Sequence, residues 1–349
     1  MRAFLVVLVV AALAAVGWWF FTHQRDKDQT GPAEHPKPAA KLVVLVVFDQ
    51  MRGDYMSRWA THYGPDGFER IKKGGAWYSE CHIPYSCTST GPGHASIATG
   101  ATPAVHGIVE NDWFDRKAGE PVYCAQPMRP YDRVPPLVAT GKSTRGSGIG
   151  FSPERLLADT VADALKAKGG RVFSLSVKDR TAVMMGGKKP DAAYCFDARD
   201  GRFGTGAYYR DTPHAWVEEF NKANLVDTFF EKKWERFKPD IDYTKFAGLD
   251  DAPGESAGTN KMGKVFPHPL KGELKEPADR FYAAVEMSPF GNELLFELAK
   301  RAIVAEKLGT GTTTDMLCLS FSSNDMIGHA WGPDSHEMMD ITLRSDLMI

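Results

Sequence analysis

Hydroxyl residues and glycines crowd one short stretch of the sequence, Ser86–Gly100, which reads SCTSTGPGHASIATG. The part that follows the proline has the composition of a short helix. A helix N-terminus presents unpaired N–H groups and the positive end of the helix dipole, so it attracts anions. A hydroxyl at that position is also able to act as a nucleophile. The stretch is not a P-loop, because no lysine follows its glycines.

Polar residues also follow three apolar, strand-like runs. Asp49 closes KLVVLVVFD, Lys178 and Arg180 follow RVFSLSV, and Asp325 and His329 follow DMLCLSF. In open α/β sheets, ligand sites form at the carboxyl ends of strands. The Asp-x-x-x-His spacing places both side chains on one face of a helical turn, and a carboxylate with an imidazole suits a divalent metal such as zinc.

These groups together suit phosphoryl transfer, which uses metals, a hydroxyl nucleophile and cations around the phosphate. Each group also has a plainer interpretation when it is taken alone. A strand-end aspartate can be a cap or turn former, and Asp-x-x-x-His or Lys-x-Arg can belong to a solvated surface. The functional interpretation therefore depends on their convergence with the hydroxyl-rich turn at one edge of one sheet.

The elements that must position these residues predict an α/β fold with a mainly parallel central sheet flanked by helices. The three apolar runs are typical of strands buried on both faces. Helices are expected around Gly67–Lys73, over Glu293–Lys307, and over Ser152–Lys168 with Ser152 as N-cap. The irregular segment at about 198–287 is expected to be an insertion or cap.

The N-terminal residues 1–21 are almost entirely apolar, and they predict either a membrane anchor or a cleaved signal peptide. Residues 22–40 are polar and proline-rich, which is typical of a flexible linker. We therefore expect an exported domain over 41–349, periplasmic or anchored to the membrane and facing outward. A net charge of -2 without basic clusters argues against nucleic acid as a partner.

The five cysteines are an odd number, so at least one has no partner within the chain. Cys81 and Cys87 are close enough in sequence to form a disulfide bond, and the pairing is left open. Cys318 lies in an apolar run and is expected to be a small buried hydrophobe.

Four segments together resemble the alkaline phosphatase superfamily: VVFDQMRGDY, TSTGPGHASIATGATPAVHGIVENDWFD, SVKDR and DMIGHAWGPDS. The sequence is most similar to the branch with a threonine nucleophile, the phosphate-irrepressible alkaline phosphatases, which are related to type I phosphodiesterases and nucleotide pyrophosphatases. The resemblance covers about Lys41 to the end of the chain, in the order of the family. It implies an alkaline phosphatase-like fold.

The resemblance also implies a role for each matching residue. Asp49 would bind one zinc ion, and Thr90 would be the nucleophile that coordinates the same ion. Asp325 and His329 would bind a second zinc ion. Asn111 would donate a hydrogen bond to a phosphoryl oxygen. The implied cofactor is therefore a pair of zinc ions.

Lys178 and Arg180 match the pair that contacts the doubly charged phosphoryl group in the monoesterase branch. The implied activity is hydrolysis of small-molecule phosphate monoesters through a phosphothreonine intermediate on Thr90. On chemistry alone Thr88 and Ser89 are rival nucleophiles, and the motif position favours Thr90.

The remaining histidines receive no ligand role from the motif. His94 and His106 are expected to be structural, whereas His82 and His336 are expected at the surface.

The resemblance further implies metal ligands that this sequence does not contain, an Asp-His pair and a last histidine. We therefore expect a catalytic domain that is incomplete at its C-terminal side, and the predicted function is that of the complete protein. Two alternatives remain, a phosphodiesterase or nucleotide pyrophosphatase of the same superfamily and a catalytically inactive, membrane-tethered binding module. A sulfatase is disfavoured, because CTSTG does not fit the sulfatase nucleophile motif.

Overall fold

A computed structural model describes residues 40–138, 148 and 150–349 of the chain. The predicted signal peptide or anchor (1–21) and nearly all of the predicted linker (22–40) lie outside the described residues. Within the described ranges, no helix combines the length and hydrophobicity that crossing a bilayer requires.

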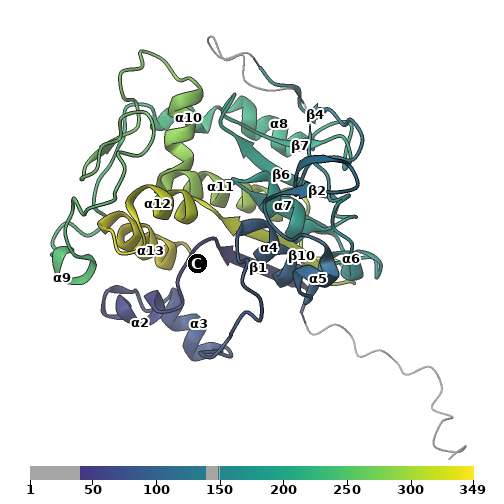
Figure 1. Cartoon of the computed structure of the whole chain (residues 1–349), viewed down its shortest axis with the longest axis horizontal. Coiled ribbons are helices and arrows are strands. Elements are labelled where there is room, and N and C mark those ends of the chain that lie inside the picture. Colours follow the sequence, from purple (N-terminus) through teal and green to yellow (C-terminus); the bar gives the residue numbers. More distant parts are fainter. Residues whose placement is uncertain (1–39, 139–147, 149) are drawn as a thin grey trace, which may run out of the picture. The chain divides into compact units, whose positions relative to one another are not determined.

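A central sheet organises the part of the chain that the structure describes (Figure 1). Its six strands lie in the order β1 (Leu42–Phe48), β10 (Asp315–Phe321), β5 (Val172–Ser176), β6 (Ala192–Asp197), β7 (Arg202–Gly206) and β4 (Arg133–Val134). The first four strands are parallel to one another, whereas β7 and β4 are antiparallel to their neighbours. The predicted α/β fold with a mainly parallel sheet is confirmed.

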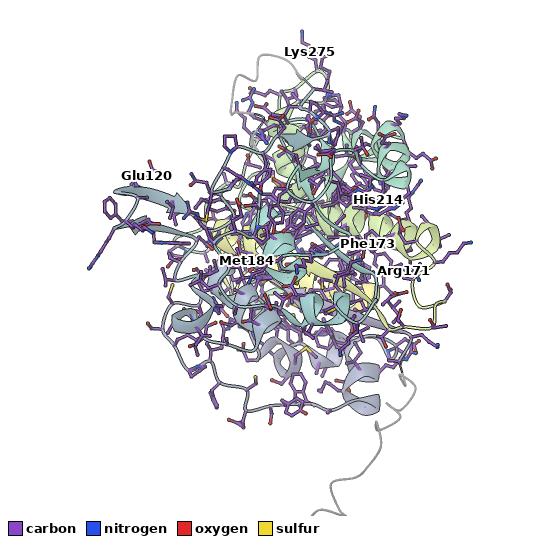
Figure 2. All side chains as sticks on the ribbon, turned by 90° about the vertical axis from the view of Figure 1, so that its right-hand side faces the viewer. Glu120, Arg171, Phe173, Met184, His214 and Lys275 are labelled. Carbon is purple, nitrogen blue, oxygen red and sulfur yellow. The ribbon has the colours of Figure 1, made fainter. Side chains whose placement is uncertain are left out.

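Helices precede and follow these strands along the chain. They are α2 (Tyr55–Arg58), α3 (Phe68–Gly74), α4 (Thr90–Thr99), α5 (Pro103–His106), α6 (Val161–Lys166), α7 (Asp179–Gly186), α8 (Ala215–Lys222), α9 (Thr244–Ala247), α10 (Asp279–Glu286), α11 (Pro289–Ala305), α12 (Ser323–Trp331) and α13 (His336–Met348), with short 3₁₀ helices η1 (Ala60–His62) and η2 (Leu225–Phe229). Two small antiparallel sheets pair β2 (Asp112–Asp115) with β3 (Glu120–Tyr123) and β8 (Lys233–Trp234) with β9 (His268–Pro269). Figure 2 shows Glu120 at the tip of the β2–β3 hairpin, which projects from the main body.

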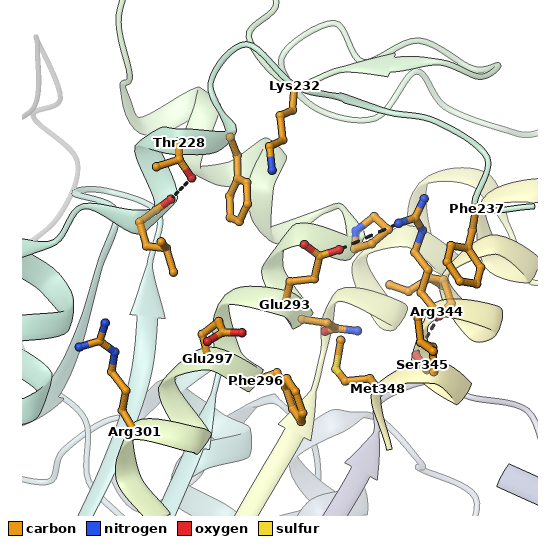
Figure 3. A pocket seen from close by; sticks show the side chains of 16 residues that line it. Thr228, Lys232, Phe237, Glu293, Phe296, Glu297, Arg301, Arg344, Ser345 and Met348 are labelled. Carbon is orange, nitrogen blue, oxygen red and sulfur yellow. Dashed lines mark hydrogen bonds and ion pairs between the residues drawn. The ribbon is translucent and has the colours of Figure 1, made fainter. Parts of the chain in front are cut away.

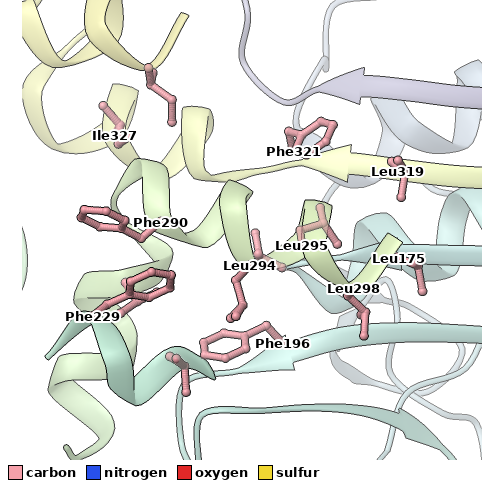
Figure 4. Packing of buried hydrophobic residues seen from close by; sticks show 14 of the residues in the cluster. Leu175, Phe196, Phe229, Phe290, Leu294, Leu295, Leu298, Leu319, Phe321 and Ile327 are labelled. Carbon is pink, nitrogen blue, oxygen red and sulfur yellow. The ribbon is translucent and has the colours of Figure 1, made fainter. Parts of the chain in front are cut away.

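The sheet is covered on both faces, and β6 shows how its sequence achieves this. Tyr194 and Phe196 belong to the hydrophobic cluster that contains α11, whereas Ala193 and Cys195 belong to the cluster that contains residues of α4 and α7. Successive side chains of a strand point to opposite faces, so one apolar run serves two cores. Figure 4 shows the α11 side of this packing, with Leu294 close to Phe196.

Strand β1 differs from the burial that its sequence predicts. Strands β5 and β10 are buried throughout, as expected. In β1, however, Val43 is 41% exposed and Val44 is 45% exposed. The reason is its place at the end of the strand order, where, among the described residues, β10 is the one strand beside it.

The predicted helix over Ser152–Lys168 is wrong in its first half. Helix α6 starts after Thr160, whose hydroxyl accepts a hydrogen bond from the Asp163 N–H at 3.0 Å, while the Asp163 carboxylate accepts the Thr160 N–H at 2.9 Å. This reciprocal pair is a capping box, which fixes the helix start there. The Ser152 N–H donates instead to the carbonyl of Ala125 at 3.0 Å, and its hydroxyl donates to Glu154.

The segment at about 198–287 contains β7, which pairs with β6 in the central sheet, and a series of short helices and strands. Asp340 of α13 is fully buried, and its carboxylate accepts three hydrogen bonds from this segment. The donors are the Trp234 indole N–H at 2.7 Å, the Phe237 N–H at 2.6 Å and the Tyr243 hydroxyl at 3.0 Å. One carboxylate therefore fastens the segment to α13.

We expect Asp340→Ala to lower the free energy of unfolding by about 3 kcal/mol, because it leaves buried donors without an acceptor. Urea denaturation followed by tryptophan fluorescence measures this change. Asp211→Ala, at an exposed position, is the control and should change stability by less than about 0.5 kcal/mol. Equal stabilities of the two variants would contradict the prediction.

Candidate active site

The order of the strands brings three of the predicted site residues to one edge of the sheet. Strands β1, β10 and β5 are adjacent and parallel, so their carboxyl ends lie side by side. Asp49 directly follows β1, Lys178 lies just after β5, and Asp325 lies in the first turn of α12 after β10. The Asp49 N–H donates to the carbonyl of Phe321 at 3.2 Å, which fixes the aspartate against the neighbouring strand end.

The Lys178 ammonium group lies between the two aspartates. Its Nζ donates to Oδ2 of Asp49 at 3.0 Å and also to Oδ2 of Asp325. All three side chains are at least nine-tenths buried. The two carboxylates thus converge on a single cationic position.

His329 lies next to this cluster but outside it. Its Nε2 is 3.4 Å from Oδ1 of Asp325, one turn earlier on α12, as the Asp-x-x-x-His spacing predicts. The His329 side chain is 70% exposed, so the imidazole faces solvent.

Thr90 is the first residue of α4 and is buried. The next N–H, of Gly91, donates to Oδ1 of Asn111 at 2.7 Å. A Cβ atom at position 91 would lie 3.1 Å from that oxygen and 3.1 Å from the Cys124 sulfur, so this close approach favours glycine. The hydrogen bond fixes the orientation of the Asn111 amide, whose NH₂ group has no hydrogen-bond partner among the described residues.

His94 connects the Thr90 turn to the strand edge. Its Nδ1 lies 2.8 Å from the Thr90 carbonyl and its Nε2 lies 2.9 Å from the Ser320 hydroxyl. Because a carbonyl only accepts, Nδ1 carries the proton and Nε2 accepts from Ser320 in the neutral ring. Burial lowers the pKa of His94, which the nearby Asp49 carboxylate opposes. The imidazole is therefore neutral and structural, as predicted.

Arg180 has few partners of its own. Its Nη1 reaches the Tyr123 hydroxyl at 3.4 Å, and that hydroxyl donates to Asp179 at 2.5 Å. The buried Nε of Arg180 has no hydrogen-bond partner among the described residues. Buried donors are usually paired, so an unpaired guanidinium N–H points to an anionic ligand. The sequence offered one sign of these contacts. Asp179 lies between Lys178 and Arg180 in the chain, and its carboxylate accepts the hydrogen bond of the Tyr123 hydroxyl that Arg180 approaches.

Glu110 is a site residue that the sequence interpretation missed. Its carboxylate accepts from the Cys87 thiol at 2.7 Å, from the Ser89 hydroxyl and from the Asn111 N–H at 2.8 Å. These hydrogen bonds lower the pKa of Glu110, the Cys87 contact most. The carboxylate thereby joins the turn before Thr90 to the segment that carries Asn111. No local pattern in the sequence signals this contact.

Behind Lys178 lies a cavity of about 280 Å³, which Glu286 also lines. The side chain of Glu286 has no hydrogen bond or ion pair with any described residue, and burial raises the pKa of its carboxyl group to about 8. The charge of Asp197 acts in the same direction, and that of Lys178 opposes it. Glu286 was likewise missed, because it comes from the distant helix α10.

The raised pKa predicts how stability depends on pH. Below about 4.5, the ordinary pKa, Glu286 is protonated in both states. Between about 4.5 and about 8 the unfolded chain releases this proton while the folded chain keeps it, so stability falls as pH rises. We expect Glu286→Gln to raise the melting temperature at pH 9 by about 2 °C or more and to leave it unchanged at pH 4. Calorimetry with Glu276→Gln, an exposed control, checks this; equal shifts in both variants would refute it.

The other histidines and the cysteines give mixed outcomes. His106 is buried and hydrogen-bonded to Ser96, and His82 is exposed, as predicted. His336, predicted at the surface, is buried: its Nδ1 lies 3.0 Å from Asp250 and its Nε2 lies 2.9 Å from the Gly248 carbonyl. Residues that are far from His336 in the sequence cover its side chain, so the residues next to it in the chain could not predict its burial.

All five cysteines are free, so Cys81 and Cys87 form no disulfide bond in this structure. Cys318 is fully buried in β10, as expected.

The side chains at this strand edge are of the types that bind divalent metal ions. Asp49 and Asp325 are buried carboxylates that already share one cation, and His329 adds an exposed imidazole nitrogen beside them. Oxygen and imidazole ligands suit zinc. Within the described residues, no group of three or more His, Cys, Asp or Glu side chains gathers around one point.

A second cavity, of about 700 Å³, lies between η2, α11 and α13. Figure 3 shows Phe296 and Met348 in the lower part of the view, with Lys232 at the top and Arg301 at the lower left. None of the predicted site residues lines it.

Comparison with known proteins identifies the chain as a member of the alkaline phosphatase superfamily. The sequence profile described as type I phosphodiesterase / nucleotide pyrophosphatase matches residues 43–349. The chain belongs to this family.

Among curated relatives, alkaline phosphatase PhoV of Synechococcus elongatus is 37% identical over 328 residues, which are 93% of this chain and 57% of PhoV. Alkaline phosphatase PafA of Elizabethkingia meningoseptica is 34% identical over 312 residues, which are 88% of this chain and 55% of PafA. The likeness to PafA places the chain in the PafA-like branch. The chain thus spans about half the length of the curated relatives it matches.

Solved structures agree with the fold. The crystal structure of wild-type PafA has a TM-score of 0.80 and 34% identity, covering 89% of this chain and 58% of that one. A PafA variant with a threonine changed to serine, and with an asparagine, a lysine and an arginine changed to alanine, gives a TM-score of 0.81 at 32% identity, covering 89% of this chain and 58% of that one.

Proposed function

We propose that the full-length protein hydrolyses phosphate monoesters at the joint edge of β1, β10 and β5, with Thr90 as the nucleophile. The observation that carries the proposal is the buried cluster at this edge, where Lys178 lies between Asp49 and Asp325. Arg180 adds a buried guanidinium N–H without a partner among the described residues. A hydroxyl nucleophile, cations and carboxylates of the kind that bind metal are the groups that phosphoryl transfer requires.

The relatives support this assignment. PhoV and PafA are both named alkaline phosphatases. The residue types altered together in the PafA variant are, in chain order, those of Thr90, Asn111, Lys178 and Arg180 here. A phosphodiesterase remains the second candidate because the family includes phosphodiesterases.

Two zinc ions are part of the proposal. Asp49 and Thr90 would hold one ion, and Asp325 and His329 would hold the other, each together with further ligands. Bound zinc lowers the pKa of a coordinated hydroxyl and neutralises phosphoryl charge.

The residues of this chain then perform two displacements. In the first, the Thr90 hydroxyl loses its proton to solvent and its oxygen forms a bond to phosphorus while the bond to the alcohol oxygen breaks, and that oxygen takes up a proton from solvent. In the second, a water molecule loses a proton to solvent and attacks phosphorus, the bond to the Thr90 oxygen breaks, and that oxygen takes up a proton as inorganic phosphate departs. The Asn111 amide and the Arg180 guanidinium donate hydrogen bonds to phosphoryl oxygens throughout, which stabilises the charge that develops on them.

The proposed site of action is outside the cytoplasm, because the N-terminal residues 1–21 have the pattern of a signal peptide or anchor. The substrates would be small phosphate esters.

We expect the purified full-length protein to hydrolyse p-nitrophenyl phosphate at least about 100-fold more efficiently than bis(p-nitrophenyl) phosphate, because Lys178 and Arg180 complement a dianion. Steady-state values of kcat/KM for the two esters measure this preference. Faster turnover of the diester would replace the proposal with the phosphodiesterase alternative. Absence of turnover together with absence of bound zinc would favour the inactive binding module.

A further inference from the structure

Lys178 occupies a position that its proposed role in substrate binding does not explain. Its Nζ is 3.0 Å from Oδ2 of Asp49 and also donates to Oδ2 of Asp325. Its side chain is 7% exposed, and those of the two aspartates are 7% and 9% exposed. The ammonium group is thus fully engaged by the two carboxylates that are proposed to hold different metal ions.

Electrostatics explains why the lysine lies there. Two buried carboxylates that face the same point repel each other, and an unpaired buried charge costs several kcal/mol. A lysine ammonium is a compact charge with three donors on a flexible stem, so it can satisfy two carboxylates at once. An arginine fork is less suited to this bridge, because its donors lie in one plane.

We infer that Lys178 is an internal counter-cation that holds Asp49 and Asp325 together before metal binds, and that metal binding displaces its ammonium group toward the phosphate-binding position. The inference depends on the proposed function for the metal site. The same side chain then serves two anions in turn, the carboxylate pair and the phosphoryl group. Metal binding therefore releases the Lys178 ammonium group, which can then contact the phosphoryl group of the substrate.

The cavity of about 280 Å³ that Lys178 lines leaves space beside its side chain. Charged residues of both signs line the same cavity, among them Asp179, Arg133 and Arg199. Lys178 can therefore change its position without displacing packed side chains. A lysine without such space would have to leave through packed side chains.

Zinc affinity tests the displacement. We expect Lys178→Met in the full-length protein to bind zinc at least about tenfold more tightly than the wild type, measured by competition with a chromophoric chelator, because no ammonium group competes for the carboxylates. The metal-free variant should also melt at a lower temperature than the metal-free wild type, because its carboxylates have lost their counter-cation. Lys166→Met removes another lysine–aspartate pair, with Asp191 at 2.6 Å, and should leave zinc affinity unchanged.

Unchanged or weaker zinc affinity of Lys178→Met overturns the inference while the metal site of the proposed function stands. If neither protein binds zinc, the proposed metal site is wrong and the inference falls with it.

The wild-type protein offers a second measurement that needs no variant to fold. Acetylation of lysines by acetic anhydride, followed by peptide mass spectrometry, reports how accessible each amine is. We expect Lys178 to react slowly in the metal-free protein and at least about fivefold faster after zinc is added, whereas Lys166 reacts at one rate in both states. Equal rates for Lys178 with and without zinc overturn the inference.

Discussion

Replacing Thr90 with alanine is expected to lower phosphate monoester hydrolysis by the full-length protein by about 10⁴-fold or more. Without the hydroxyl no phosphothreonine forms, and only positioning and electrostatic stabilisation remain to accelerate direct attack by water. Thr90→Ser keeps a hydroxyl group and should retain a measurable part of kcat. Steady-state kinetics with p-nitrophenyl phosphate measures both variants.

Ser89→Ala is the matched control, because Ser89 is a rival nucleophile one residue away. Its hydroxyl donates to the Glu110 carboxylate, so it is already engaged and should not attack phosphorus. We expect Ser89→Ala to lose less than tenfold in kcat. Acid quenching during turnover and mass spectrometry should locate the phosphoryl group on Thr90. A phosphorylated Ser89, or full activity of Thr90→Ala, would exclude Thr90 as the nucleophile.

The sequence was sufficient to predict the strand edge. The runs that precede Asp49, Lys178 and Asp325 are mostly apolar and strand-like, and the carboxyl ends of neighbouring parallel strands meet at one edge. That β10 lies between β1 and β5 could not be predicted from these runs. The strand order depends on packing between segments that are far apart in the sequence.

The errors have the same physical origin. The pattern around Ser152 satisfies local rules for a helix start, but a stronger capping box at Thr160 and Asp163 determines the observed boundary. The burial of His336 depends on segments that are distant in the sequence. Val43 is exposed because no described segment covers it. Local patterns predict elements better than they predict which neighbours cover those elements.

The contacts around the nucleophile turn could not be predicted for a related reason. Glu110 contacts Cys87 and Ser89, which precede it by 23 and 21 residues, and the bridge that Lys178 forms joins residues that follow three different strands. Each of these charged residues alone also fits a solvated surface. Only the fold shows which of them are buried against one another.

Arg180→Ala is expected to lower kcat/KM for a phosphate monoester by about 100-fold, equivalent to about 2.7 kcal/mol, and to lower kcat/KM for a diester by less than fivefold. A monoester dianion carries one more charged oxygen than a diester, so it loses more when a bidentate donor is removed. The buried Nε of Arg180 has no hydrogen-bond partner in the described part of the chain, so this donor is available for a ligand. The ratio of the two kcat/KM values is therefore the informative quantity, because a general loss of folded protein would lower both.

Added guanidinium separates loss of the cation from loss of structure in Arg180→Ala. If the side chain acts through its charge and its N–H groups, millimolar guanidinium should restore at least about tenfold of the monoester activity and leave the diester activity unchanged. Arg129→Ala, at a side chain that is 72% exposed, should need no rescue and show wild-type kinetics. Equal losses for both esters, or no response to guanidinium, would mean that Arg180 supports the fold of the β5 end rather than the phosphoryl group. In that case the preference for monoesters would have to come from Lys178, whose release from Asp49 and Asp325 is the condition for substrate contact.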